Sequence, residues 1–164
     1  MVSVNKGGFI VQVINTVQIA GLLEAVFDLV TTTRFWPQWH PATIGVGGVT
    51  ERPFQLGDKI RERAHIGAHT YEGNLTVTEH TRPAHAVLLG ENRRIQISYS
   101  FQQVGDQVAY SRTLAYYPED FAASTPDPEQ LATLMDAQSQ QALQKVKTLV
   151  EGILADEAKM TIRE

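Results

Sequence analysis

The clearest pattern in the sequence is an alternation of apolar and polar residues through the middle of the chain. Apolar side chains occupy every second position in four segments, 57–66, 71–79, 93–102 and 107–117. A period of two is typical of antiparallel strands with one buried and one solvated face. The short apolar segment 86–90 predicts another strand. Gly, Pro and Asp residues predict turns at 66–68, 81–84 and 104–106.

Other patterns predict the elements at the two ends. A Val- and Ile-rich stretch predicts a first strand over 9–19, and the apolar spacing of 21–32 predicts a helix of about three turns. The Gly-rich segment 42–50 suits a bent or bulged strand. A long helix is expected to begin at Asp127 and Pro128 and to run to about residue 157, because apolar residues recur at helical spacing.

Composition narrows the class of protein. The chain has 164 residues, a formal charge of −4, 43% hydrophobic and 20% charged residues, so we expect a single globular domain over residues 1–164. The mildly acidic balance argues against nucleic acid as a partner. No stretch of about 18 apolar residues predicts a membrane span, and the first residues lack a signal-peptide pattern. We therefore expect a cytoplasmic monomer or homodimer.

Several polar residues occupy positions where a core residue would be expected. Glu62 and Arg112 share the apolar faces of their strands, and Gln138 interrupts the apolar stripe of the last helix. Tyr99 and Tyr110 also point inward in this pattern. So many polar side chains are rarely tolerated in a tightly packed core, so they favour a lined cavity. A structural ion pair between Glu62 and Arg112, or a shifted strand register, is the alternative.

Three segments resemble a known superfamily. They are TTTRFWPQWHPAT (31–43), FQLGDKIRER (54–63) and LTVTEHTRPAHAVLLG (75–90), followed by the long C-terminal helix. Together they are similar to the START-related SRPBCC superfamily, in particular its polyketide cyclase/dehydrase and lipid transport branch. The resemblance implies an α+β helix-grip fold. In that fold a curved antiparallel sheet of about seven strands wraps around a long C-terminal helix, with two short helices after the first strand.

The resemblance also gives a role to the segment FWPQWHP (35–41), which holds both tryptophans of the chain. In the superfamily this segment is a short helix whose aromatic residues close one end of the cavity. Pro37 and Pro41 restrict the backbone and end any helix there. We expect Trp39 to be a buried plug, and Trp36 to lie at the cavity rim with more of its surface exposed.

No recognisable catalytic or cofactor motif is present. The chain has no cysteine, which excludes disulfides, thiolate nucleophiles and Cys-ligated zinc. His65 and His69 have a spacing that binds metal on a helix, but Gly67 between them predicts a hairpin turn. We therefore expect no metal and no cofactor, and no catalytic residue is assigned.

Two functions are compatible with these observations. The first is binding of a small hydrophobic or aromatic ligand, lipid- or polyketide-like, in a cavity between the sheet and the last helix. The alternative is an enzyme of the polyketide cyclase/dehydrase type that uses the same cavity for cyclisation or dehydration. A third, weaker possibility is a protein–protein adaptor. The candidate ligand-binding residues are Trp36, Trp39, Glu62, Tyr99, Tyr110, Arg112, Met135 and Gln138.

Overall fold

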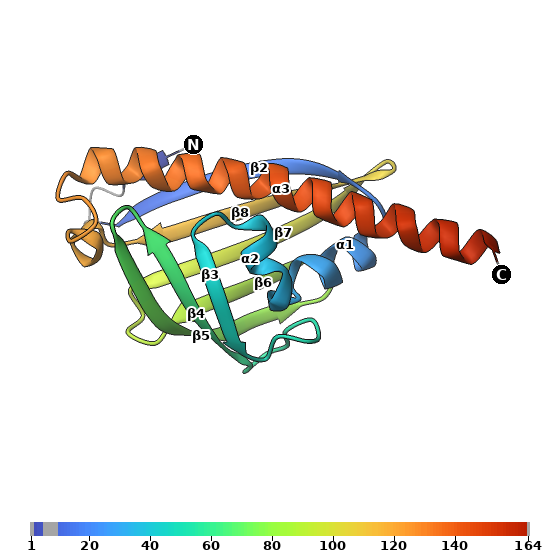
Figure 1. The fold of residues 1–164 in the computed structure, drawn as a ribbon, viewed down its shortest axis with the longest axis horizontal. Helices are drawn as coiled ribbons and strands as arrows, with labels where there is room; N and C mark the ends of the chain where they lie inside the picture. The colour runs from blue at the N-terminus through green and yellow to red at the C-terminus, as the bar shows by residue number, and fades with distance from the viewer. Residues whose placement is uncertain (1, 5–9, 164) are drawn as a thin grey trace.

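An antiparallel sheet crossed by a long helix forms the framework of the computed structural model, which describes residues 2–4 and 10–163 (Figure 1). The strand order is β1-β2-β8-β7-β6-β5-β4-β3. The strands are β1 (Val2–Val4), β2 (Val11–Ala20), β3 (Thr43–Gly48), β4 (Lys59–Ile66), β5 (His69–Thr81), β6 (His85–Gly90), β7 (Ile95–Val104) and β8 (Gln107–Tyr116). Strands β2 to β8 are the seven predicted strands, and β1 is an addition. Phe9, where the first strand was expected to begin, lies outside the described residues.

The alternation in the sequence becomes the two faces of this sheet. In β8 every second residue is buried, from Val108 to Tyr116. The β4–β5 and β7–β8 hairpins turn at Gly67 and Gly105, whose φ angles of 60° and 64° are left-handed values that glycine adopts without strain. The strand predicted over 42–50 is β3, and its register shifts between Thr43 and Gly45 as a bulge requires.

Two short helices follow β2, as expected. Helix α1 (Leu23–Val30) buries Val26, Phe27 and Val30 against the core. A 3-10 turn, η1 (Thr33–Phe35), leads into α2 (Trp36–Trp39), a single turn with Pro37 in its first positions. These elements connect β2, the neighbour of the edge strand β1, to β3 at the opposite edge of the sheet.

The last helix, α3 (Pro128–Arg163), is six residues longer than predicted. It begins where expected, because the Asp127 carboxylate accepts a hydrogen bond from the Glu129 amide at 3.0 Å. A second 3-10 turn, η2 (Pro118–Phe121), precedes it. Helix α3 packs against β2, α1, α2 and η2, and its C-terminal turns extend beyond the sheet (Figure 1). The helix-grip fold that the resemblance implied is confirmed.

Candidate functional site

Glu62 and Arg112 both point into the interior, as the alternation predicted. Across the β4–β5 ladder Glu62 faces Gly73, and across the β7–β8 ladder Arg112 faces Tyr99, with no bulge in either ladder. Arg112 is 5% exposed, whereas Glu62 is only partly buried. The two side chains do not form an ion pair, so the alternative explanation of a structural ion pair between them is excluded.

The surroundings of Glu62 hold its carboxyl group in an unusual state. Thr43, on the neighbouring strand β3, donates a hydrogen bond from its hydroxyl to Oε2 at 2.7 Å. Oε1 accepts no hydrogen bond from the described part of the chain. Burial raises the pKa of Glu62, while the Thr43 hydrogen bond and the positive charge of Arg112 favour the ionised form.

A pocket of about 470 Å³ lies beside Glu62. Strand β5 is longer than β6, which pairs only with its second half, from Leu75 to Thr81. Beside the first half of β5 lie the β6–β7 turn and η2, and the pocket occupies this region. Its lining residues are Glu62, Ala64, Ile66, Tyr71, Glu72, Gly73, Asn74, Leu75, Gly90, Glu91, Asn92, Arg94, Ile95, Asp120 and Phe121.

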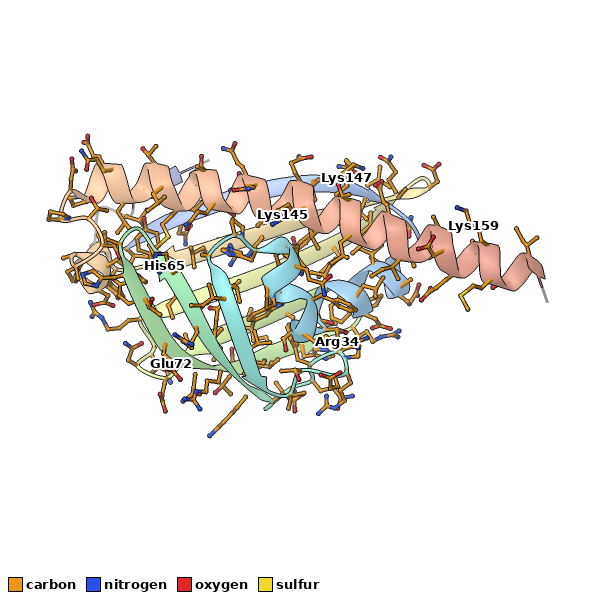
Figure 2. The ribbon with its side chains drawn as sticks, viewed as in Figure 1. Arg34, His65, Glu72, Lys145, Lys147 and Lys159 are labelled. Atoms are coloured by element: carbon orange, nitrogen blue, oxygen red, sulfur yellow. The ribbon has the colours of Figure 1, made fainter. Side chains whose placement is uncertain are left out.

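The position of this pocket differs from the expected one. We expected a cavity between the sheet and the long helix, but no described residue of α3 contributes to the lining. Glu72, one of the lining residues, lies at the end of the molecule far from Lys159 near the C-terminus of α3 (Figure 2). The pocket therefore opens beside the sheet, near η2.

The inner wall of the pocket is mostly apolar. Tyr71 contributes its ring, which packs edge-on against Phe121 at 5.0 Å, and its hydroxyl is paired with Ser124 at 2.8 Å. Gly73 adds space, because a Cβ built on it would meet no atom within 4 Å. Glu62 is thus the ionisable group on this wall. The apolar wall residues are Ala64, Ile66, Leu75, Ile95 and Phe121.

The rim of the pocket is acidic. Glu72, Glu91 and Asp120 join Glu62 as acidic lining residues, and Arg94 is the lining residue of opposite charge. Arg94 is already engaged, since its Nε contacts Asp120 at 2.7 Å and its Nη2 contacts Glu119 at 3.0 Å. Glu72 pairs with Arg61, which lies outside the lining.

A second polar cluster, around Arg112, lies in the core outside this pocket lining. The Arg112 Nε and Nη1 atoms are buried without a hydrogen-bond partner among the described residues, while the Tyr99 phenol interacts with both Arg112 and the Tyr110 hydroxyl. Tyr110 stacks on Phe101 at 4.8 Å and meets Tyr99 edge-on at 5.6 Å. Burial raises the pKa of Tyr99 to about 12 and that of Tyr110 well above its usual value. Both phenols therefore stay neutral at ordinary pH.

Helix α3 contributes a different residue to the interior than the sequence suggested. Met135 is 4% exposed and belongs to the core, but Gln138 is only half-buried. Ser139 takes the buried position, and its hydroxyl has no hydrogen-bond partner among the described residues. The four-residue spacing of Leu131, Met135 and Ser139 was the signal that could have identified it.

The expectation that Trp36 is more exposed than Trp39 is wrong. Their exposed fractions are 2% and 1%, because the single turn of α2 packs both indoles into the core. Neither tryptophan lines the pocket. His40, at the end of α2, is half-buried, and its Nδ1 accepts a hydrogen bond from the Ala42 amide at 3.1 Å. Burial and the positive charges of Arg112 and Lys145 lower the pKa of His40 well below its usual value.

Of the eight candidate ligand-binding residues, Glu62 lies in the pocket wall. Tyr99, Tyr110, Arg112 and Met135 lie in the core, so their role toward a ligand stays a prediction, as does that of Gln138. Sequence reasoning missed Thr43 and Gly73, which flank Glu62 on the neighbouring strands. The expected turn between His65 and His69 is present, and within residues 2–4 and 10–163 no three potential metal ligands group together.

Comparison with solved structures identifies the fold. An aromatase/cyclase, Zhui, from Streptomyces sp. R1128 superimposes with a TM-score of 0.66 at 12% identity, covering 87% of this chain and 94% of that one. TTHA0849 from Thermus thermophilus superimposes with a TM-score of 0.70 at 12% identity, covering 87% of this chain and 98% of that one. The polyketide-cyclase-like protein Cgl2372 from Corynebacterium glutamicum superimposes with a TM-score of 0.59 at 13% identity, covering 87% of this chain and 93% of that one.

These similarities confirm the predicted resemblance at the level of the fold. No protein-family model and no curated sequence matches the chain. In the described part of the chain, no helix is both long and apolar enough to cross a membrane. Function must therefore be argued from the site, because one fold can carry many activities.

Proposed function

We propose that this protein binds a small ligand with an apolar body and one polar head group in the pocket beside Glu62. The observation that carries the proposal is the combination of an apolar wall with a partly buried carboxyl group whose Oε1 has no partner within the described chain. Ligand pockets usually combine apolar walls with a few polar groups that orient the ligand. A volume of about 470 Å³ is within the usual range for such sites.

Glu62 lowers the stability of the folded protein when it is ionised, and this also supports a binding role. A carboxyl group kept in surroundings that raise its pKa destabilises the ionised protein. Gly73 faces it across the ladder and leaves space where most strand residues would place a side chain. A group that costs stability and borders open space is a candidate for function.

Filling the space at Gly73 tests this function. N-phenyl-1-naphthylamine, a neutral fluorescent probe, should bind wild-type protein saturably at one site. Gly73→Val should weaken binding at least about tenfold, which corresponds to about 1.4 kcal/mol. Gly45→Val is the matched control, because Gly45 is also a strand glycine with no atom within 4 Å of its Cβ position but does not line the pocket. Equal affinities in the two variants would refute the proposed pocket.

The second candidate is an enzyme of the cyclase type, and the cluster around Arg112 favours it. A guanidinium with two buried, unpartnered donors beside neutral tyrosines could stabilise negative charge developing on a carbonyl oxygen. Turnover of a poly-β-keto thioester that is lost in Arg112→Leu, with the fold intact by circular dichroism, would support this function. Turnover that survives the substitution would exclude Arg112 from it.

A further inference from the structure

The charge of the pocket narrows the kind of ligand it accepts. Four lining residues carry carboxyl groups, Glu62, Glu72, Glu91 and Asp120, against the single guanidinium of Arg94. Arg94 is tied to Glu119 and Asp120 and stacks over the Tyr117 ring at 4.1 Å. Glu72 is paired with Arg61 and Asp120 with Arg94, so Glu62 and Glu91 are the lining carboxylates without an ion pair among the described residues. Like charges in a cleft repel an approaching anion.

On the inner wall, Glu62 also disfavours an anionic ligand, here by direct contact. The Glu62 Oε2 atom is occupied by the Thr43 hydroxyl, whereas Oε1 accepts nothing from the described residues. An ionised carboxylate only accepts hydrogen bonds, so its natural ligand partner is a donor, and a charged donor binds most strongly. Burial raises the pKa of Glu62, the Thr43 hydrogen bond and the charge of Arg112 act in the opposite direction, and an ammonium group on Oε1 would further favour the ionised form.

We infer that the pocket binds an organic amine, with its ammonium group on Glu62 and its apolar body along Ala64, Ile66, Leu75, Ile95 and Phe121. This inference rests on the proposed function and deepens it by naming the head group. Gly73, directly across the ladder from Glu62, leaves the space in which a head group can reach the carboxylate. A carboxylic acid of the same shape would meet repulsion at the rim and again at Glu62.

Three probes with one ring system and different head groups test the inference by isothermal titration calorimetry at pH 7.5. They are 1-naphthylmethylamine, 1-naphthylmethanol and 1-naphthoate. In wild-type protein the amine should bind at least about tenfold more tightly than the alcohol, and the acid should bind most weakly. This ranking needs no variant, so it does not depend on how any substitution folds.

The variant Glu62→Gln assigns the preference to its residue. Glutamine keeps the shape and can still accept the Thr43 hydrogen bond, but it removes the charge. The amine should then lose at least about tenfold in affinity, while the alcohol should change by less than about threefold. Glu79→Gln is the matched control, since Glu79 lies on the same sheet, is exposed and is outside the pocket lining.

The possible failures separate the two proposals. If the acid binds as tightly as the amine, or if Glu62→Gln leaves the amine affinity unchanged, the amine inference is overturned while a ligand pocket remains. If Gly73→Val does not weaken an amine that does bind, that amine binds elsewhere and the inference is also overturned. If none of the three probes binds, both the inference and the proposed function are overturned.

Discussion

Glu62 on β4 lies directly opposite Gly73 on β5, and the position where a Gly73 side chain would begin has no atom within 4 Å. The partly buried carboxyl group of Glu62 therefore borders open space. Valine or threonine at position 73 would suit a strand better than glycine. Glycine at this position keeps the space beside Glu62 unfilled.

Gly73→Val should not destabilise the protein. Its backbone needs no left-handed conformation and the new side chain meets no neighbour, so the free energy of unfolding should stay the same or rise by up to about 1 kcal/mol. Gly90→Ala provides the contrast within the same pocket lining, because its Cβ would lie 2.5 Å from the Ile95 Cγ2 atom. We expect a loss of about 1–3 kcal/mol there. Urea unfolding of both variants measures the difference, and a destabilised Gly73→Val would contradict the open space.

Trp36→Ala and Trp39→Ala should both destabilise the fold. The two indoles are almost completely buried, so each truncation should lower the free energy of unfolding by about 3–5 kcal/mol. Urea unfolding monitored by circular dichroism keeps the measurement independent of the tryptophan removed. If Trp36→Ala has wild-type stability, Trp36 lies at the cavity rim after all, in contradiction to the burial of its side chain.

The strands of the sheet are predicted well from the sequence, because inward-facing and outward-facing residues alternate without interruption through β4 and β8. The same regularity placed Glu62 and Arg112 inside. It did not identify Thr43 as the partner of Glu62, because the bulge between Thr43 and Gly45 breaks the alternation that would show which way Thr43 points. The exposure of Trp36 was mispredicted for a similar reason, since a single helical turn has no period from which to read its buried side.

The pocket position depends on relationships between distant segments. It follows from the unequal lengths of β5 and β6 and from the packing of η2 beside them, and neither is encoded in a local pattern. Helix α3 differs in this respect, because the four-residue spacing of Leu131, Met135 and Ser139 indicates the buried position that was assigned to Gln138. Local sequence thus predicts which residues face inward more reliably than which of them border a cavity.

His40 should make the protein less stable in mild acid. Its folded pKa is lowered, so just below the ordinary histidine value of 6.5 the unfolded chain binds more protons than the folded chain. Stability is therefore lost as the pH falls through this window, by at most about 1.4 kcal/mol per pH unit.

His40→Asn isolates this effect, because asparagine can also accept the Ala42 amide hydrogen bond but does not titrate. The stability of wild type relative to His40→Asn should decrease from pH 7.5 to pH 5. Arg112 and Lys145 are the positively charged groups that act on His40. The measurement is urea unfolding at each pH, and a difference that does not change with pH would show that His40 titrates alike in both states.

Glu62 should have the opposite pH dependence. Its folded pKa is raised above the reference value of 4.5, so over a window that starts near 4.5 the folded chain binds more protons than the unfolded chain. Wild-type stability is then lost as the pH rises through this window, again by at most about 1.4 kcal/mol per pH unit. Below the window the carboxyl is protonated in both states and contributes no such change.

Glu62→Gln should therefore gain stability relative to wild type as the pH rises from 4 through the raised pKa of Glu62. Thr43 retains an acceptor in the variant, and Tyr99, whose pKa burial raises to about 12, stays neutral over this range. Arg112 is the charged residue that acts on Glu62. Urea unfolding followed through Trp36 and Trp39 fluorescence measures the difference, with Glu79→Gln as the control for the same chemical change at an exposed position. Because the same substitution is expected to weaken amine binding, a gain in stability with a loss of affinity would identify Glu62 as a residue kept for its ligand. A variant that loses stability at pH 8 would show instead that the ionised carboxylate holds the fold together.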